Sequence, residues 1–340
     1  MARYLIIGAG AIGAGLAAQF ELNGIPYRLF GRGEQIRHIQ AHGIEYVRPE
    51  GTQRLMLQTG TASDELELMQ DDRLVFATKT QDLEAACRDW AWRPVQGDGP
   101  ARCASELPVL TPQNGMAAER IALRWFGHVI GASINTPARY TRLGEIVVGG
   151  YPEPGLIVTG RFPAGADPVA EGIAADLERA GYLAESRPDI MRWKAAKLLN
   201  SVRNNALDLF DGPPGRLQGF SQRLLQEALA VLAAMGLEPA RPQERRHSVA
   251  HWGIAPDCGI EPGQQSTWQS LARGSSHEVD FLNGEVVLLG RLHGVPTPFN
   301  AAIQQAVGRL ARRGQLSQDG LLGHVDDLWR SAEDLAGRLR

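Results

Sequence analysis

The sequence predicts an α/β protein in which an N-terminal doubly wound sheet of the Rossmann type is followed by a mainly α-helical C-terminal domain. Three observations lead to this prediction. A glycine-rich turn lies between a strand pattern and a helix pattern near the N-terminus, short apolar runs then alternate with helical patterns, and helical patterns dominate from Asp189 onward. We therefore expect one domain over residues 1–186 and a second over residues 187–340.

The N-terminal domain is expected to open with a strand, a helix and a second strand. Tyr4 to Ile7 form a buried apolar run, and Ile12 to Leu22 have helical spacing. Gly24 ends that helix, and Tyr27 to Phe30 form the next strand. The later elements are strands at 74–77, 109–110 and 128–134, helices at 82–90, 117–125 and 168–180, and turn-rich segments suited to antiparallel strands at 141–150 and 151–168. Such alternation implies a parallel sheet with helices on both faces.

The C-terminal domain shows helical spacing almost throughout. The expected helices cover residues 189–209, 222–235, 266–273, 277–293, 298–312 and 320–339.

Composition narrows the class of protein. With 44% hydrophobic residues, 21% charged residues and a net charge of −3, the chain of 340 residues has no charge bias that favours nucleic acid or a membrane surface. No apolar run approaches the length of a membrane span, and the N-terminus lacks a signal-peptide pattern. Cys87, Cys103 and Cys258 have neither disulfide nor metal-ligand spacing. We expect a cytoplasmic protein with free thiols and no metal site.

The first turn has the spacing of a dinucleotide-binding fingerprint. Gly8 permits the tight turn, Gly10 lets the backbone approach a pyrophosphate, and Gly13 allows the helix to pack closely on the strand. An ordinary glycine-rich turn is the alternative, but the position between a strand and a helix favours a cofactor. The residues expected to line that cofactor are Gly8, Ala9, Gly10, Ala11, Ile12 and Gly13.

The end of the second strand favours NADP. An NAD site would show Asp or Glu here, as would most FAD sites, whereas this chain has Arg32, which suits a 2′-phosphate. A solvated loop arginine is the alternative, because 32 of the 35 basic residues are arginine.

Two further strand ends carry polar side chains. Lys79 follows the strand that ends near Ala77, and Asn114 with Gly115 follows the next one. Ligands bind beyond the carboxyl ends of strands in such sheets, so both side chains are candidates for contacts with cofactor and substrate. For Asn-Gly alone, a simple turn is the alternative.

These residues resemble a known family, the ketopantoate reductases (2-dehydropantoate 2-reductases), which are related to the 6-phosphogluconate dehydrogenase-like enzymes. The matching segments are IGAGAIG, LFGRGEQI, FATKTQD, TPQNGM, RWKAAKLLNSVRNN and SSHEVDFLNGEVVLLGRLHGVPTPFN. The resemblance implies a Rossmann domain, a helical domain, NADPH as hydride donor, and a 2-oxo acid bound in the cleft between the domains.

Site roles follow from the resemblance, residue by residue. It implies contacts of Lys79 and Asn114 with cofactor and substrate and a lysine of the 192–205 helix as general acid. It also places Asn200 and Asn204 beside that lysine, and Ser266 and Glu278 on the substrate carboxylate and hydroxyl. Glu278 has the alternative role of capping a long helix that it would begin. The family's usual Asp a turn after Ser266 is replaced here by Ser270.

The choice of lysine is open, because Ala196 stands where the family usually has its catalytic lysine. At roughly 100° per residue, Lys197 lies roughly 60° from Asn200 and shares a face with it, whereas Lys194 lies roughly 120° away. The alternative is that both lysines solvate a helix face, but the sequence contains only three lysines, which argues against this for at least one of them. We expect Lys197 to be the general acid and Lys194 to be a flanking residue or a secondary substrate contact.

The leading hypothesis is NADPH-dependent reduction of 2-dehydropantoate to (R)-pantoate, a step of pantothenate and coenzyme A biosynthesis. One alternative is a related NADP-dependent hydroxy-acid dehydrogenase with another substrate. The other is a regulatory protein that binds NADP without catalysis. A homodimer is a possible assembly, since the helical domain is apolar.

Overall fold

The computed structural model describes residues 2–60, 66–97, 100, 102–260, 266–272, 274, 276–312 and 322–338. The chain forms two compact units. The sheet unit comprises residues 1–113, 117–191 and 242–260, and the helical unit comprises residues 114–116, 192–241 and 261–340. Within the described ranges, no helix is long and apolar enough to cross a membrane.

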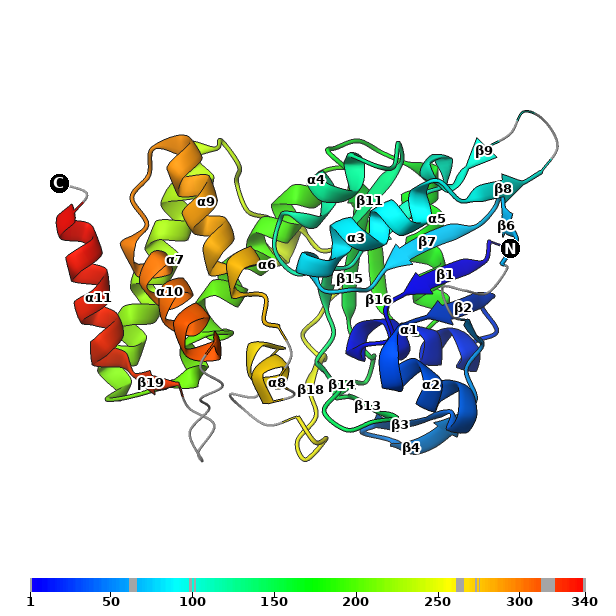
Figure 1. Cartoon of the computed structure of the whole chain (residues 1–340), viewed down its shortest axis with the longest axis horizontal. Coiled ribbons are helices and arrows are strands. Elements are labelled where there is room, and N and C mark those ends of the chain that lie inside the picture. Colours follow the sequence, from blue (N-terminus) through cyan, green and yellow to red (C-terminus); the bar gives the residue numbers. More distant parts are fainter. Residues whose placement is uncertain are drawn as a thin grey trace. The chain divides into compact units, whose positions relative to one another are not determined.

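The sheet unit is built on one eight-stranded sheet (Figure 1). In spatial order its strands are β16 (Leu183–Ser186), β15 (Leu156–Arg161), β11 (Val129–Asn135), β10 (Val109–Thr111), β7 (Arg73–Phe76), β1 (Tyr4–Ile7), β2 (Tyr27–Phe30) and β5 (Thr59–Gly60). The six strands from β11 to β5 are parallel, and β15 runs antiparallel to β11. The predicted doubly wound sheet of the Rossmann type is confirmed.

Side-chain alternation along the strands supplies a core on each face of the sheet. Tyr4 and Ile6 of β1 belong to one buried cluster, and Leu5 and Ile7 belong to the other. The first cluster takes in helices α1 (Ala11–Leu22), α2 (Gly33–His42) and α5 (Pro168–Arg179). The second takes in α3 (Thr80–Ala91) and α4 (Ala118–Leu123). Helices therefore cover both faces, as the sequence predicts.

Smaller sheets complete this unit. A four-stranded sheet contains β12 (Ala138–Arg139), β13 (Glu145–Val148), β3 (Ile44–Arg48) and β4 (Gly51–Leu55). A three-stranded sheet contains β6 (Leu68–Met69), β8 (Pro94–Gln96) and β9 (Arg102–Cys103). A two-stranded ladder joins β14 (Gly150–Tyr151) to β18 (Gly253–Ile254).

The β14–β18 ladder shows why residues 242–260 belong to the sheet unit. Besides that ladder, the Glu185 carboxylate accepts a hydrogen bond from the backbone N–H of Arg246 at 3.0 Å. The limits expected from the sequence, 1–186 and 187–340, stay a prediction of the domain organisation.

The helical unit contains the remaining helices. They are α6 (Ile190–Asn204), whose first two residues belong to the sheet unit, α7 (Pro214–Ala234), α8 (Ser266–Ala272), α9 (Asn283–His293), α10 (Pro298–Arg312) and α11 (Val325–Arg338). A short ladder of β17 (Phe210–Asp211) and β19 (Gly323–His324) lies in the same unit. Its core clusters around Phe220, Leu224, Ile303 and Leu328, all of them fully or almost fully buried.

Three helix starts in the helical unit differ from the expectation by several residues. Helix α7 begins at Pro214, eight residues before the expected start. Proline suits the first position of a helix, so Pro214 marks the start of α7. A 3-10 turn at Val279–Phe281 precedes α9, so Glu278 does not begin a long helix. The last helix was expected over residues 320–339, but α11 starts only at Val325. Residues 320 and 321 of the expected range lie outside the described part of the chain.

Candidate functional site

The glycine turn of the sheet unit requires glycine at two of its three fingerprint positions. Gly8 has a φ of +121°, and a Cβ there would lie 2.6 Å from the carbonyl carbon of Ala77. A Cβ on Gly13 would lie 1.9 Å from the carbonyl oxygen of Gly8. Both contacts are too short for any side chain, so these glycines let the helix pack on the strands, as the sequence predicts.

Gly10 has a different surrounding, because a Cβ there would meet nothing within 4 Å. It is the N-cap residue of α1, where no side chain caps the helix, and the first turn of α1 contains no acidic residue. Backbone N–H groups at such a helix start bind phosphate, and the open space at Gly10 leaves room for it. The turn therefore fits the pyrophosphate of a dinucleotide.

A pocket of about 370 Å³ adjoins this turn within the sheet unit. Ala9, Gly10, Arg32 and Gln35 are among the residues that line it. Arg32 is the N-cap residue of α2 and is exposed. Two of the residues predicted for the glycine turn thus share one pocket with the predicted phosphate-binding arginine.

Lys79 lies beyond the carboxyl end of β7, as the N-cap residue of α3, and is partly buried. Gln113, which the sequence reasoning missed, follows β10 and bonds to the backbone at the end of β7. Its side-chain N–H groups donate to the carbonyl oxygens of Phe76 at 2.5 Å and Thr78 at 3.0 Å. It fixes the backbone just before Lys79. Its place next to Asn114 in the sequence was the signal that could have identified it.

Asn114 is partly buried and belongs to the helical unit. The adjacent Gly115 has a φ of +83°, and a Cβ there would lie 2.4 Å from the carbonyl oxygen of Phe281. Residues 114–116 therefore pack against the 3-10 turn that follows Glu278. In this way the helical unit brings Asn114 close to the Glu278 segment.

Lys197, Asn200 and Asn204 lie on one face of α6. The Asn204 side-chain amide donates a hydrogen bond to the side-chain oxygen Oδ1 of Asn200 at 3.3 Å. Burial lowers the pKa of Lys197 from 10.5 to about 8, because desolvation disfavours the charged amine. A lysine with such a pKa can donate and accept a proton near neutral pH.

Lys194, which was expected to be a flanking residue or a secondary substrate contact, is buried. Only 1% of its surface is exposed, and it is one of the largest fully buried side chains among the described residues. The interpretation that both lysines merely solvate a helix face is therefore wrong for Lys194.

Ser266 and Glu278 both precede α9 in the chain. Ser266 is the first residue of α8 and is partly buried, and its carbonyl oxygen accepts the Ser270 hydroxyl at 2.8 Å. Glu278 is the N-cap residue of the 3-10 turn, where its side chain makes no capping hydrogen bond. A pure capping role for Glu278, one of the two alternatives, is therefore not what the structure shows.

Asn283 links the Glu278 segment to α6, and the sequence reasoning missed it. It is fully buried, and its side-chain amide donates to the carbonyl oxygen of Val202 at 3.1 Å and to Asn300 at 3.0 Å. Together with the contact of Gly115 with Phe281, this bond places Asn114, Glu278 and the C-terminal half of α6 in one part of the helical unit.

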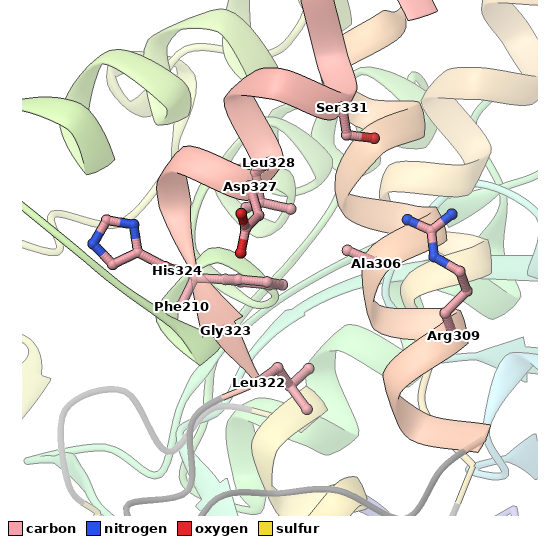
Figure 2. Close-up of a pocket in the computed structure, with 9 residues that line it drawn as sticks. All are labelled: Phe210, Ala306, Arg309, Leu322, Gly323, His324, Asp327, Leu328 and Ser331. Carbon is pink, nitrogen blue, oxygen red and sulfur yellow. The ribbon is translucent and has the colours of Figure 1, made fainter. Parts of the chain in front are cut away.

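A second pocket, of about 220 Å³, lies elsewhere in the helical unit (Figure 2). The polar residues Arg309, His324, Asp327 and Ser331 line this pocket together with the apolar residues Phe210, Ala306, Leu322 and Leu328. None of the predicted site residues lines it. Among the described residues, no cluster of His, Cys, Asp or Glu could hold a metal ion, and all three cysteines are free.

Comparison with known proteins identifies the family. One family model, ketopantoate reductase PanE/ApbA, matches residues 4–163, and a second, ketopantoate reductase PanE/ApbA C terminal, matches residues 189–311. A 2-dehydropantoate 2-reductase of Mesorhizobium japonicum is 28% identical, over 90% of this chain and 97% of its own. One of Pyrococcus horikoshii is 24% identical, over 87% of this chain and 93% of its own.

Solved structures show the same fold. The crystal structure of a PanE/ApbA family ketopantoate reductase from Ralstonia eutropha JMP134 has a TM-score of 0.73 at 22% identity, covering 92% of this chain and 99% of that one. The ternary structure of D-mandelate dehydrogenase with NADH and anilino(oxo)acetate has a TM-score of 0.74 at 20% identity, with the same coverage. Because the two family models together span most of its length, the chain belongs to the ketopantoate reductase family.

Proposed function

We propose that this protein reduces a small 2-oxo acid with NADPH, and that 2-dehydropantoate, reduced to (R)-pantoate, is its substrate. Membership of the family and the relatives named 2-dehydropantoate 2-reductase support this activity. The observation that carries it is Lys197, whose pKa of about 8 suits proton transfer and whose helix face also holds Asn200 and Asn204.

The sheet unit supplies the residues for the cofactor. We assign the pyrophosphate to the Gly8–Gly13 turn and the 2′-phosphate to Arg32, and we assign Lys79 to the cofactor side of the site. When bound, NADPH supplies the hydride that the carbonyl carbon receives. The uncapped start of α1, the open space at Gly10 and the adjoining pocket support this assignment.

Lys197 is assigned as the general acid. At pH 7 a group with a pKa of about 8 is mostly protonated, so the ammonium can stabilise the developing alkoxide and then donate its proton. A lysine of ordinary pKa would hold the proton more firmly, and an arginine could not release it. Depression of the pKa by burial is therefore what fits this residue for the step.

The substrate contacts are assigned to polar side chains of the helical unit. Asn200 and Asn204 orient the carbonyl group, Asn114 and Ser266 contact the carboxylate, and Glu278 accepts a hydrogen bond from the substrate hydroxyl. Lys194 is retained as a secondary substrate contact. The partial burial of Glu278 and the packing of the segment that follows it against Gly115, next to Asn114, support a role toward a ligand.

NADPH consumption, followed by absorbance, tests the proposal with a panel of 2-oxo acids. We expect the highest kcat/KM with 2-dehydropantoate. Faster turnover of another 2-oxo acid would support the proposed reaction but identify a different substrate. The departures from the family pattern at Ala196 and Ser270 favour this outcome. NADPH binding without turnover of any acid would contradict the proposed enzymatic activity and favour a regulatory protein.

Location and assembly are part of the same proposal. The buried free thiols of Cys87 and Cys258 suit the reducing cytoplasm, where we place the reaction. A homodimer is the proposed assembly, and light scattering of the purified protein tests it.

A further inference from the structure

The pocket beside the glycine turn carries two charges of opposite sign. Arg32 and Glu34 both line this pocket, as Gly10 does. Both side chains are exposed, and within the described part of the chain neither makes a hydrogen bond or ion pair. The guanidinium and the carboxylate are therefore both available to a ligand in the pocket.

The backbone around Gly31 explains why both charges reach the same pocket. A Cβ on Gly31 would lie 2.9 Å from the Cβ of Ala9, so the chain leaving β2 runs directly against the glycine turn. Gly33, with a φ of +75°, then starts α2, and Glu34 falls in its first turn. The start of α2 is thereby held beside the position where a dinucleotide places its adenosine ribose.

Gln35 adds a neutral group to the wall of this pocket. It is 7% exposed, and its side-chain oxygen accepts a hydrogen bond from the backbone N–H of Gly144 at 3.1 Å. Its Nε2 is buried and has no hydrogen-bond partner among the described residues. Buried donors are rarely left unpaired in proteins, so this amide points to a ligand that supplies the acceptor.

We propose, on the basis of the cofactor role proposed above, that Glu34 makes this subsite accept the free ribose of NADH as well as the 2′-phosphate of NADPH. The Arg32 guanidinium pairs with a 2′-phosphate. The Glu34 carboxylate accepts hydrogen bonds from a free 2′-hydroxyl and repels a phosphate. The Gln35 amide donates to either group. Glu34 is thus the residue that limits discrimination between the two cofactors.

Binding of two small probes, without substrate, tests this inference on the full chain. Adenosine 2′,5′-bisphosphate represents NADPH and 5′-AMP represents NADH, and calorimetry gives both affinities. In Glu34→Gln we expect the bisphosphate to bind about tenfold tighter relative to 5′-AMP than in the native protein, as for the loss of one charged hydrogen bond. In Arg32→Ala we expect the bisphosphate to lose about 10- to 100-fold in affinity while 5′-AMP changes little.

Matched controls remove the same charges outside the pocket. Arg37→Ala removes an exposed cation from the same helix, and Glu45→Gln removes an exposed carboxylate from β3, so both should leave the affinity ratio unchanged. An unchanged ratio in Glu34→Gln would overturn the role of Glu34 and leave the proposed function standing. Failure of the native protein to bind either probe would overturn the cofactor subsite and the proposed function with it.

Discussion

Replacing Lys197 by methionine should affect activity and stability in opposite directions. Methionine keeps the length and apolar stem of lysine but removes the amine that we assign as general acid. We expect kcat to fall by about 100-fold or more, the usual contribution of such an acid, while NADPH binding changes little. In the native protein kcat should be constant below pH 8 and decline above it, because the pKa of Lys197 is about 8 and only the protonated amine donates.

The gain in stability follows from the same pKa. Folding lowers the pKa of Lys197 from 10.5 to about 8, and one pKa unit corresponds to about 1.4 kcal/mol, so the charged amine costs the folded state up to about 3 kcal/mol. The cost is fully present below pH 8, decreases between pH 8 and 10.5, and is absent above, since the unfolded chain then also releases the proton. Lys197→Met should therefore raise Tm at pH 7 and lose this advantage near pH 10.5.

The assay combines NADPH consumption with thermal unfolding at both pH values. Arg203→Gln serves as the control, because it removes an exposed cation from the same helix. A methionine variant with native kcat would refute the assignment of the acid. If Lys194→Met instead abolished turnover, the acid would be Lys194. A lower Tm at pH 7 in Lys197→Met would show that the amine stabilises the fold, contrary to the desolvation argument.

Two further substitutions test the packing around the site. Gly13→Ala should abolish NADPH binding in a fluorescence titration, because its Cβ would lie 1.9 Å from the Gly8 oxygen, whereas Gly15→Ala in the same helix, with its nearest contact at 3.5 Å, should bind normally. Equal affinities in the two variants would contradict the close packing. Asn300→Ala should lower the free energy of unfolding by about 2–4 kcal/mol, because the buried Asn283 amide and the Glu227 carboxylate each lose a hydrogen bond to the Asn300 side chain. Gln304→Ala is the control, because it removes an exposed hydrogen bond to Asp280 and should change stability little. Urea unfolding measures both variants, and equal losses of stability would contradict the larger contribution of the buried Asn300 bonds.

The glycine turn could be predicted from sequence because the spacing of its glycines, between a strand pattern and a helix pattern, is a local signal. The positions of Gly8 and Gly13 are dictated by contacts between neighbouring segments, and the strand limits Tyr4–Ile7 and Tyr27–Phe30 agree with the expectation. The shared face of Lys197 and Asn200 also followed from helical spacing alone. The contact of Gly13 with Gly8 and the shared helix face involve residues close together in the chain, whereas the contact of Gly8 with Ala77 does not.

Other features depend on residues far apart in the chain. The apolar spacing from residue 277 to 293 is continuous, but the helix starts only at Asn283, which is held by Val202 and Asn300. No helix was predicted at Gly33–His42, because polar residues dominate it, yet Ile36 and Ile39 are buried in the sheet core. The burial of Lys194 could not be foreseen either, since spacing gives the direction of a side chain but not what covers it.

The path of the chain has a practical consequence for dissecting the protein. Between residues 113 and 261 the backbone passes from one compact unit to the other five times, and residues 114–116 form the shortest excursion. A fragment ending at residue 186 would lack β18, which pairs with the β14 edge, and Arg246, whose N–H binds the buried Glu185. No single cut releases either unit with all of its own residues. Separate expression of the sheet unit therefore calls for a rejoined gene that links residue 191 to residues 242–260 by a short spacer.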